Sequence, residues 1–291
     1  MRCGSTGGGV PRRAAVLGHP IAHSLSPVLH RAAYAALGLE GWLYDAIDVT
    51  EEELPQFVRD LDGSWVGLSL TMPLKQTVIG LLDHIEPLAE VVGAVNTVLV
   101  QASGSTPVLT GANTDVHGLV AALGEGLGSA ASVAGRTAAV LGAGATAAST
   151  LAALAQLGCA APVVHVRAVS RSGGLLRAAH RMGVEPVVRT LDAAAATVVR
   201  ADVVVSTLPP RAADDVAAEL LAAGTRPAGV LLDVAYDPRP TALQRAWTQL
   251  GGIAVPGERM LLHQAVEQVR LMTGRPGPVE AMSAALEAVL G

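Results

Sequence analysis

The chain has 291 residues, of which 51% are hydrophobic and 15% are charged, and its formal net charge is -5. This length is typical of two domains, and the composition excludes a largely disordered chain. The negative charge and the 2% of aromatic residues give neither a basic surface nor stacking side chains, so we expect no nucleic-acid partner.

The basic residues are almost all arginine, since the sequence holds a single lysine, Lys75. An ammonium group can lose its proton inside a protein, whereas a guanidinium cannot. Lys75 is therefore a candidate for proton transfer, and chance survival on the surface is the alternative.

The N-terminal residues, 1–13, are glycine-rich and lack the apolar stretch of a signal peptide, so we interpret them as a flexible tail. The window Thr137–Val164 is apolar but contains glycine, proline and hydroxyl residues, which favours strand, turn, helix and strand over a membrane span. Cys3 and Cys159 fit no disulfide or zinc spacing. We expect a cytoplasmic protein with no metal and no membrane partner. The sequence leaves open whether the protein forms a homodimer.

Short apolar runs alternate with helical patterns along the first part of the chain, which predicts an α/β fold. A Ser/Gly/Pro turn between Val95–Gln101 and Val108–Gly111 predicts a hairpin. The other elements are expected as strands at Ala14–Leu17, Leu43–Val49, Val66–Leu70 and Thr97–Gln101, and as helices at Pro27–Leu37, Glu51–Leu61 and Pro73–Leu82.

From about residue 115 the alternation continues in the pattern of a doubly wound nucleotide-binding domain. A helix is expected over Glu258–Thr273, because Gly274 supplies its C-terminal stop. Strands are expected at Ala138–Leu141, Val163–Val169, Val187–Arg189, Val203–Ser206 and Val230–Val234.

A glycine-rich loop, GAGATA at residues 142–147, joins one of these strands to a predicted helix. In this GxGxxA pattern Gly142 permits a tight turn, Gly144 permits close approach of a pyrophosphate, and Ala147 permits close packing of the helix on the strand. The helix N-terminus adds amide donors. The loop therefore predicts a dinucleotide site.

The next strand is followed by Ser170, Arg171 and Ser172, where an NAD site would often place an acidic residue for the ribose hydroxyls. Arg171 can instead pair with a 2′-phosphate, so this segment favours NADP over NAD. A solvated surface arginine is the alternative.

Three polar segments interrupt the apolar pattern of the first part. Ser26 precedes Pro27 and is expected to cap a helix, whereas Ser24 is not needed by that cap, and two hydroxyls beside a helix N-terminus suit a carboxylate. Lys75 is expected in the first turn of the helix that Pro73 opens, where the helix dipole opposes a cation by about 0.3–1 kcal/mol and favours the neutral amine.

The third segment contains Asn96, at the start of an apolar strand, and Asp115, in the string GANTD. Asn96 needs partners if it is buried, or else it is a turn residue. Asp115 is either a functional carboxylate or, like Thr114, a cap of the following helix.

Taken together, these segments resemble the shikimate dehydrogenase family. The family more often has Asn at Ser69, Asn-Arg-Thr at residues 170–172, Met at Val234 and Gly-Leu-Gly-Met at residues 257–260. The matching strings follow the family's order and are GHPIAHSLSP (18–27), SLTMPLK (69–75), VGAVNT (92–97), GANTD (111–115), GAGATA (142–147), DVAY (233–236) and PGERMLLHQA (256–265).

The resemblance implies an NADP-dependent enzyme of the shikimate pathway, which leads to chorismate and the aromatic amino acids. The implied reaction is the reversible reduction of 3-dehydroshikimate to shikimate. The resemblance also implies a two-domain α/β fold, in which residues 1–114 form a substrate-binding domain to which 257–291 return, and residues 115–256 form a Rossmann-type NADP-binding domain.

The resemblance further implies the roles of individual residues. Lys75 would be the general acid/base, and Asp115 would hydrogen-bond both Lys75 and the substrate. The implied substrate-binding residues are Ser24, Ser26, Thr71, Asn96, Asp115, Tyr236 and Gln264. The implied cofactor-binding residues are Gly142, Ala143, Gly144, Ala145, Thr146, Ser170, Arg171, Ser172, Val234 and Gly257.

Two other functions compete with this one. An NAD-dependent quinate/shikimate dehydrogenase would prefer more room around C1 of the substrate and an acidic residue after the second strand of the nucleotide domain. A non-catalytic sensor of a shikimate-like ligand would have no reason to keep Lys75 and Asp115 together with an intact glycine loop.

Overall fold

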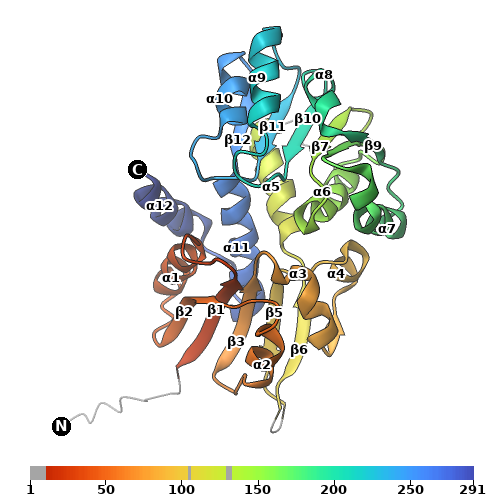
Figure 1. Cartoon of the computed structure of the whole chain (residues 1–291). Coiled ribbons are helices and arrows are strands. Elements are labelled where there is room, and N and C mark those ends of the chain that lie inside the picture. Colours follow the sequence, from red (N-terminus) through yellow and green to blue (C-terminus); the bar gives the residue numbers. More distant parts are fainter. Residues whose placement is uncertain (1–10, 104–105, 129–132) are drawn as a thin grey trace, which may run out of the picture. The chain divides into compact units, whose positions relative to one another are not determined.

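The computed structural model describes residues 11–103, 106–128 and 133–291, and the chain divides into two compact units (Figure 1). The first unit contains the chain up to Glu86, Val95–Ala112 and Gln268–Gly291, and the second contains Pro87–Ala94 and Asn113–Glu267. Most of the segment that we interpret as a tail, together with Cys3, lies outside the described residues.

The first unit is built on a mixed sheet with the strand order β2-β1-β3-β5-β6-β4 among the described residues. β1 pairs in parallel with β2 and β3, and β5 pairs antiparallel with β3 and β6, so the predicted hairpin is confirmed. The strands are β1 (Arg12–Gly18), β2 (Trp42–Asp48), β3 (Trp65–Leu70), β4 (His84–Ile85), β5 (Thr97–Gln101) and β6 (Val108–Ala112).

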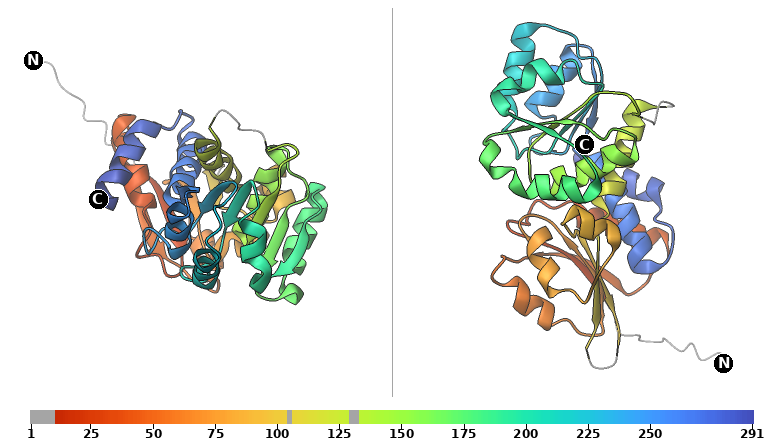
Figure 2. Two further views of the ribbon diagram at one scale, coloured as in Figure 1. Left: turned by 90° about the horizontal axis from the view of Figure 1, so that it is seen from above. Right: turned by 90° about the vertical axis from the view of Figure 1, so that its right-hand side faces the viewer.

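Helices lie on both faces of this sheet (Figure 2). α1 (Ser26–Ala36) packs against α12 (Val279–Leu290), and α2 (Leu54–Arg59) packs against the 3-10 turn η1 (Val78–Leu81). Residues of the strands, of α1 and of α11 (Gly257–Thr273), together with Ile21 from the segment between β1 and α1, form a core cluster: Ala14, Val16, Ile21, Tyr34, Tyr44, Val66 and Met272.

The helix predicted over Pro73–Leu82 is wrong in its extent. The structure has a one-turn helix, α3 (Leu74–Thr77), followed by η1. Lys75 is the second residue of this single turn, so the longer helix expected to carry a dipole at this position is absent.

The second unit contains a parallel sheet with the order β12-β11-β10-β7-β8-β9 among the described residues, which is the arrangement of a Rossmann fold. The α/β fold class and the doubly wound pattern are confirmed. The predicted strand Val163–Val169 ends earlier, because residues 169–171 turn into a 3-10 helix. The strands are β7 (Ala138–Leu141), β8 (Val163–Val166), β9 (Val187–Thr190), β10 (Val203–Ser206), β11 (Val230–Asp233) and β12 (Ile253–Pro256).

Both faces of this sheet are buried, as expected for a parallel sheet. Along β10, Val203 and Val205 belong to one apolar cluster, and Val204 belongs to the cluster on the opposite face. The helices of the unit are α4 (Pro87–Val92), α5 (Asp115–Leu127), α6 (Ala145–Gln156), α7 (Gly173–Met182), α8 (Ala194–Val198), α9 (Asp214–Ala223), α10 (Ala242–Gln249) and the first part of α11 (Gly257–Thr273).

The division between the units differs from the predicted boundaries in two places. α4 belongs to the second unit because it packs against α6 and α7, and Arg181 Nε donates to Val91 O at 3.0 Å. α11 is continuous but is divided after Glu267, because its first turns contact α5, where a Cβ atom on Gly118 would lie 2.7 Å from Met260 O. The alternation of apolar runs with helical patterns predicts strands and helices, but it does not predict which helices pack together.

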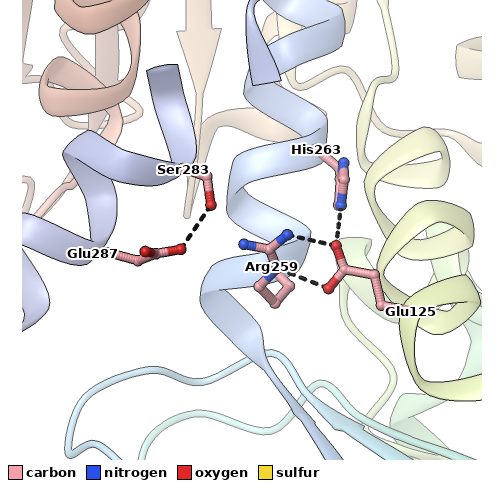
Figure 3. Close-up of polar contacts among 5 residues, drawn as sticks. All are labelled: Glu125, Arg259, His263, Ser283 and Glu287. Atoms are coloured by element: carbon pink, nitrogen blue, oxygen red, sulfur yellow. Dashed lines mark hydrogen bonds and ion pairs between the residues drawn. The ribbon is translucent and has the colours of Figure 1, made fainter. Parts of the chain in front are cut away.

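An ionic cluster joins α5 to α11 (Figure 3). Glu125 accepts hydrogen bonds from Arg259 Nε at 2.8 Å and Arg259 Nη2 at 2.6 Å, and its Oε1 pairs with His263 Nε2 at 2.7 Å. The hydrogen bonds from Arg259, and then from His263, hold the pKa of Glu125 below its ordinary value. The cluster therefore stabilises the ionised carboxylate of Glu125.

We expect Glu125→Gln to lower the free energy of unfolding at neutral pH by about 1 kcal/mol, since solvent screens this part-exposed cluster. The folded-state pKa of Glu125 is depressed, so its contribution is complete above the unfolded-state pKa of about 4.3 and is lost as pH falls through the folded-state pKa. Thermal unfolding of both proteins at neutral and acid pH measures this difference.

Glu287→Gln is the matched control, because Glu287 accepts a hydrogen bond from the Ser283 hydroxyl at 3.0 Å (Figure 3). Because this carboxylate is exposed, we expect little change in Tm at any pH. A Glu125→Gln deficit that persists undiminished in acid would contradict the ionic origin of the effect.

Candidate active site

The glycine-rich loop follows β7 at the carboxyl edge of the second sheet, where the strand order reverses between β7 and β10. Gly142 has φ +112°, and a Cβ atom there would lie 2.5 Å from Thr207 Oγ1. Thr207 is itself fixed, because its N–H and hydroxyl donate to Leu141 O at 2.8 and 2.9 Å. The turn therefore requires glycine at residue 142.

Gly144 is the N-cap of α6, is exposed, and would have no atom within 4 Å of an added Cβ. No side chain caps this helix N-terminus. Open space in front of the first amides of a 12-residue helix suits a pyrophosphate group. The positions of Gly142, Ala143, Gly144, Ala145 and Thr146 thus fit a bound dinucleotide.

The segment after β8 is a compact turn. Val169–Arg171 forms the 3-10 helix η2, and the hydroxyl of buried Ser172 donates to Val169 O at 2.7 Å. Ser170 and Arg171 are exposed at the carboxyl edge of the sheet. Arg171 is therefore exposed to solvent after β8, the strand that pairs with β7, which precedes the glycine loop. The Ser172 hydroxyl stabilises the turn itself.

The ends of β11 and β12 meet at Val234 and Gly257. A side chain at Gly257 would run into the carbonyl oxygen of Val234, so the backbones approach each other closely there. Burial raises the pKa of Tyr236, which therefore keeps its phenolic proton. Both predicted nicotinamide-side residues lie at the same sheet edge as the glycine loop.

A buried carboxylate that the sequence analysis left without a role, Asp233, holds this turn. Its Oδ2 accepts the Thr241 hydroxyl at 2.7 Å, and Thr241 forms a capping box with Gln244 at the start of α10. Burial raises the pKa of Asp233, although the Thr241 hydrogen bond opposes the shift. The string DVAY contained this signal, since an acidic residue ending a buried strand needs a partner.

In the first unit, the predicted cap of α1 is wrong. Leu25 is the N-cap residue, without a side-chain cap bond, and Ser26 is the first residue of the helix. The Ser24 hydroxyl accepts the Ser26 N–H at 3.3 Å, so Ser24, and not Ser26, serves the helix start. Pro27 is compatible with this start, because the N–H that proline lacks would have no intrahelical partner in the first turn.

The polar segments of the first unit are tied together by backbone hydrogen bonds. Thr71 N–H donates to Leu17 O at 2.9 Å, and His19 N–H donates to Met72 O at 3.1 Å. Val95 N–H donates to the Lys75 carbonyl at 2.8 Å, which places Lys75 beside the segment that carries Asn96. Asn96 is 1% exposed. The unit therefore gathers the segments of Ser24, Ser26, Thr71, Lys75 and Asn96.

In the second unit, Asp115 is the first residue of α5 and is 3% exposed. The capping hydrogen bond comes from Asn113, whose Oδ1 accepts Val116 N–H at 3.2 Å. Thr114, the N-cap residue, makes no side-chain cap bond, and its hydroxyl lies 3.5 Å from Gln264 Oε1. The capping alternative is therefore wrong for Thr114, and Asp115 lies one residue after the N-cap position.

These features define a class of protein: an oxidoreductase with a Rossmann-type dinucleotide-binding unit and a separate α/β unit that carries a lysine-containing polar cluster. Residues 16–98 match the family model described as shikimate dehydrogenase substrate binding domain. Residues 257–287 match the shikimate 5'-dehydrogenase C-terminal domain, and 137–236 match a model described as NADP oxidoreductase coenzyme F420-dependent. The chain belongs to the shikimate dehydrogenase family.

Individual relatives support this membership over nearly the full chain. The shikimate dehydrogenase (NADP(+)) of Rubrobacter xylanophilus is 40% identical over 93% of this chain and 94% of its own length. The crystal structure of Mycobacterium tuberculosis shikimate dehydrogenase is 40% identical, with TM-score 0.83, and covers 96% of this chain and 100% of that one.

Another similar structure is the quinate dehydrogenase of Corynebacterium glutamicum in complex with NAD. It is 28% identical, has TM-score 0.80, and covers 96% of this chain and 100% of that chain. The fold is therefore shared between proteins named for different substrates and solved with different nicotinamide cofactors.

None of the helices in the described part of the chain is both long and apolar enough to cross a bilayer. Within residues 11–103, 106–128 and 133–291, no three or more His, Cys, Asp or Glu side chains are grouped to hold a metal ion.

Proposed function

We propose that this chain is an NADP-dependent shikimate dehydrogenase, which reversibly reduces 3-dehydroshikimate to shikimate. The observation that carries the proposal is family membership at 40% identity over 93% of the chain, combined with a glycine loop at the switch point of the second sheet. We assign substrate binding mainly to the first unit and NADP binding to the second. The homodimer and the cytoplasmic location stay predictions.

The cofactor assignment is supported by the shape and charge of the carboxyl edge of the second sheet. Gly142–Thr146 offers a helix N-terminus to the pyrophosphate, and Arg171 offers a guanidinium to a 2′-phosphate. Val234 and Gly257 offer backbone groups for the nicotinamide end. When bound, NADPH supplies the hydride for the reduction.

The substrate assignment rests on the polar residues that match the family's motifs. The Ser24 and Ser26 hydroxyls, with Thr71 and Tyr236, bind the carboxylate. Asn96, Asp115 and Gln264, together with Lys75, bind the ring hydroxyls. Asn96, Asp115 and Gln264 are buried, and hydrogen bonds to buried groups discriminate strongly against a ligand that cannot make them.

The proton in this reaction is assigned to Lys75. A ketone oxygen gains negative charge as its carbon is reduced, so a positioned acid must deliver a proton to it. Lys75 Nζ donates that proton during reduction and accepts it during oxidation. Asp115 orients the ammonium group and the substrate hydroxyl.

The proposal is tested by incubating the purified protein with 3-dehydroshikimate and NADPH, and by identifying the product by mass spectrometry. We expect one NADPH to be consumed for each shikimate formed. Absence of NADPH consumption, or a product other than shikimate, would reject the proposed reaction.

Arg171 offers a separate test of cofactor choice. We expect Arg171→Ala to raise KM for NADPH by about tenfold or more, because a charge-assisted hydrogen bond is lost, and to change KM for NADH little. Steady-state kinetics with both cofactors measure this ratio.

Arg200→Ala is the matched control for this variant. Arg200 is also exposed but precedes β10, at the amino edge of the sheet, so neither KM is expected to change. Equal losses with NADPH and NADH in Arg171→Ala would contradict contact with the 2′-phosphate.

A further inference from the structure

A buried chain of hydrogen bonds crosses the core of the first unit between Tyr44 on β2 and Gln268 on α11. The Tyr44 hydroxyl donates to Ser69 Oγ at 2.7 Å, and the Ser69 hydroxyl donates to Gln268 Oε1 at 2.9 Å. Tyr44 is 1%, Ser69 3% and Gln268 1% exposed. Hydrogen bonds of this kind are strong determinants of side-chain orientation, because unpaired buried polar groups are costly.

The same chain continues from Gln268 to Asn96, which the proposed function places on the substrate. Gln268 Nε2 donates to Thr97 Oγ1 at 3.0 Å and to the Asn96 carbonyl at 3.2 Å. The Thr97 hydroxyl then donates to Asn96 Oδ1 at 2.9 Å. Gln268 is thus linked to the Asn96 side chain through the Thr97 hydroxyl, and it is hydrogen-bonded directly to the Asn96 backbone.

The orientation of the Gln268 amide follows from one contact. A backbone carbonyl only accepts, so the Asn96 carbonyl requires the amide nitrogen of Gln268 on its side and leaves the amide oxygen facing Ser69. The Thr97 hydroxyl accepts a hydrogen bond from Gln268 Nε2 and donates one to Asn96 Oδ1. Asn96 Oδ1 is therefore an acceptor within the protein, and Asn96 Nδ2 is the end that donates to other partners.

We propose that Gln268 is a positioning residue that determines the hydrogen-bond polarity of Asn96 and thereby its recognition of a substrate hydroxyl. Asn96 donates through Nδ2 to the oxygen of that hydroxyl, and Gln268, acting through Thr97, keeps the amide in this orientation. The inference rests on the proposed function, because it concerns binding of shikimate by Asn96.

The experiment compares Gln268→Leu, Gln268→Glu and Thr97→Val with the wild-type protein, with shikimate and NADP⁺ as substrates. Gln268→Leu removes all three hydrogen bonds of the amide, and Gln268→Glu keeps only the acceptor for Ser69. Thr97→Val preserves the side-chain volume and removes the hydroxyl that orients Asn96. We expect each variant to raise KM for shikimate by about tenfold, with KM for NADP⁺ and kcat within about twofold of wild type.

The double variant Gln268→Leu/Thr97→Val is expected to raise KM for shikimate no further than Gln268→Leu alone, because both substitutions break one chain. Val269→Ala is the matched control: Val269 is adjacent on α11 and 0% exposed, so its truncation lowers Tm without touching the chain. The KM for shikimate in this control is expected to equal that of wild type.

An unchanged KM for shikimate in Gln268→Leu and Thr97→Val would overturn the inference, as would an equal rise in Val269→Ala or additive effects in the double variant. If Gln268→Leu does not fold, the volume-preserving Thr97→Val decides the result alone. Wild-type protein that does not turn over shikimate would overturn the proposed function and this inference with it, so the two failures are distinguishable.

Discussion

Replacing Lys75 with arginine is expected to lower kcat for shikimate oxidation by about 10²–10⁴-fold, the usual contribution of a positioned general acid/base. Arginine keeps the positive charge and approximate length but cannot release its proton at any accessible pH. We expect KM for NADP⁺ and Tm to stay close to wild type, since α3 is short and Lys75 is not part of the apolar core.

Steady-state kinetics and a shikimate-binding titration separate the proton role from a binding role. Arg59→Lys is the control, because it makes the reverse exchange at the exposed end of α2 and is expected to change neither kcat nor Tm. Retention of wild-type kcat in Lys75→Arg would remove Lys75 from the proton-transfer step.

Asp115→Asn is expected to reduce kcat by about 10²-fold or more, because the proposed mechanism uses this carboxylate to orient the general acid/base and the substrate hydroxyl. We expect a small change in Tm, since Asp115 lies after the N-cap position of α5 and Asn113 Oδ1 accepts Val116 N–H. Kinetics together with thermal unfolding measure both quantities on the same preparation.

Asn113→Ala provides the stability comparison for Asp115→Asn. Asn113 caps Val116 N–H and donates to Ala94 O at 2.9 Å and Ser149 Oγ at 3.1 Å, so its removal is expected to lower the free energy of unfolding by about 1–3 kcal/mol. A collapse of Tm in Asp115→Asn with normal residual activity would show that this carboxylate has a structural role instead.

The strands of the nucleotide-binding unit were predictable from sequence because their signals are local. β7 and β10 have the predicted bounds, since each is a run of four apolar or small residues followed at once by turn residues. The glycine loop was equally predictable, because the steric demand for glycine at residue 142 is imposed by its own turn. Short apolar runs with clear stops therefore gave reliable elements.

The elements that depend on distant packing were missed. β4 is a two-residue strand that exists through its pairing with β6, and β12 is the edge strand beside β11. α12 packs against α1 from the opposite end of the chain. The predicted ten-residue helix at Pro73 is interrupted after Thr77 for a reason that the local sequence does not show.

The candidate site shows the same contrast. Lys75 was found because it is the single lysine of the sequence, and Asn96 and Asp115 were found because they are polar residues within short motifs. Gln268 was missed because its contact with Ser69 joins residues 199 positions apart. A signal was nevertheless present, since Gln264 and Gln268 lie four residues apart and so share one face of α11, where two amides need buried partners.

The most direct test of the proposed activity is a nicotinamide absorbance assay that crosses shikimate and quinate with NADP⁺ and NAD⁺. We expect the highest kcat/KM for shikimate with NADP⁺, by about tenfold or more over the same substrate with NAD⁺, because Arg171 is proposed to pair with the 2′-phosphate. Highest kcat/KM for quinate with NAD⁺ would contradict the substrate and cofactor assignments, and no turnover with any of the four pairs would contradict catalysis itself.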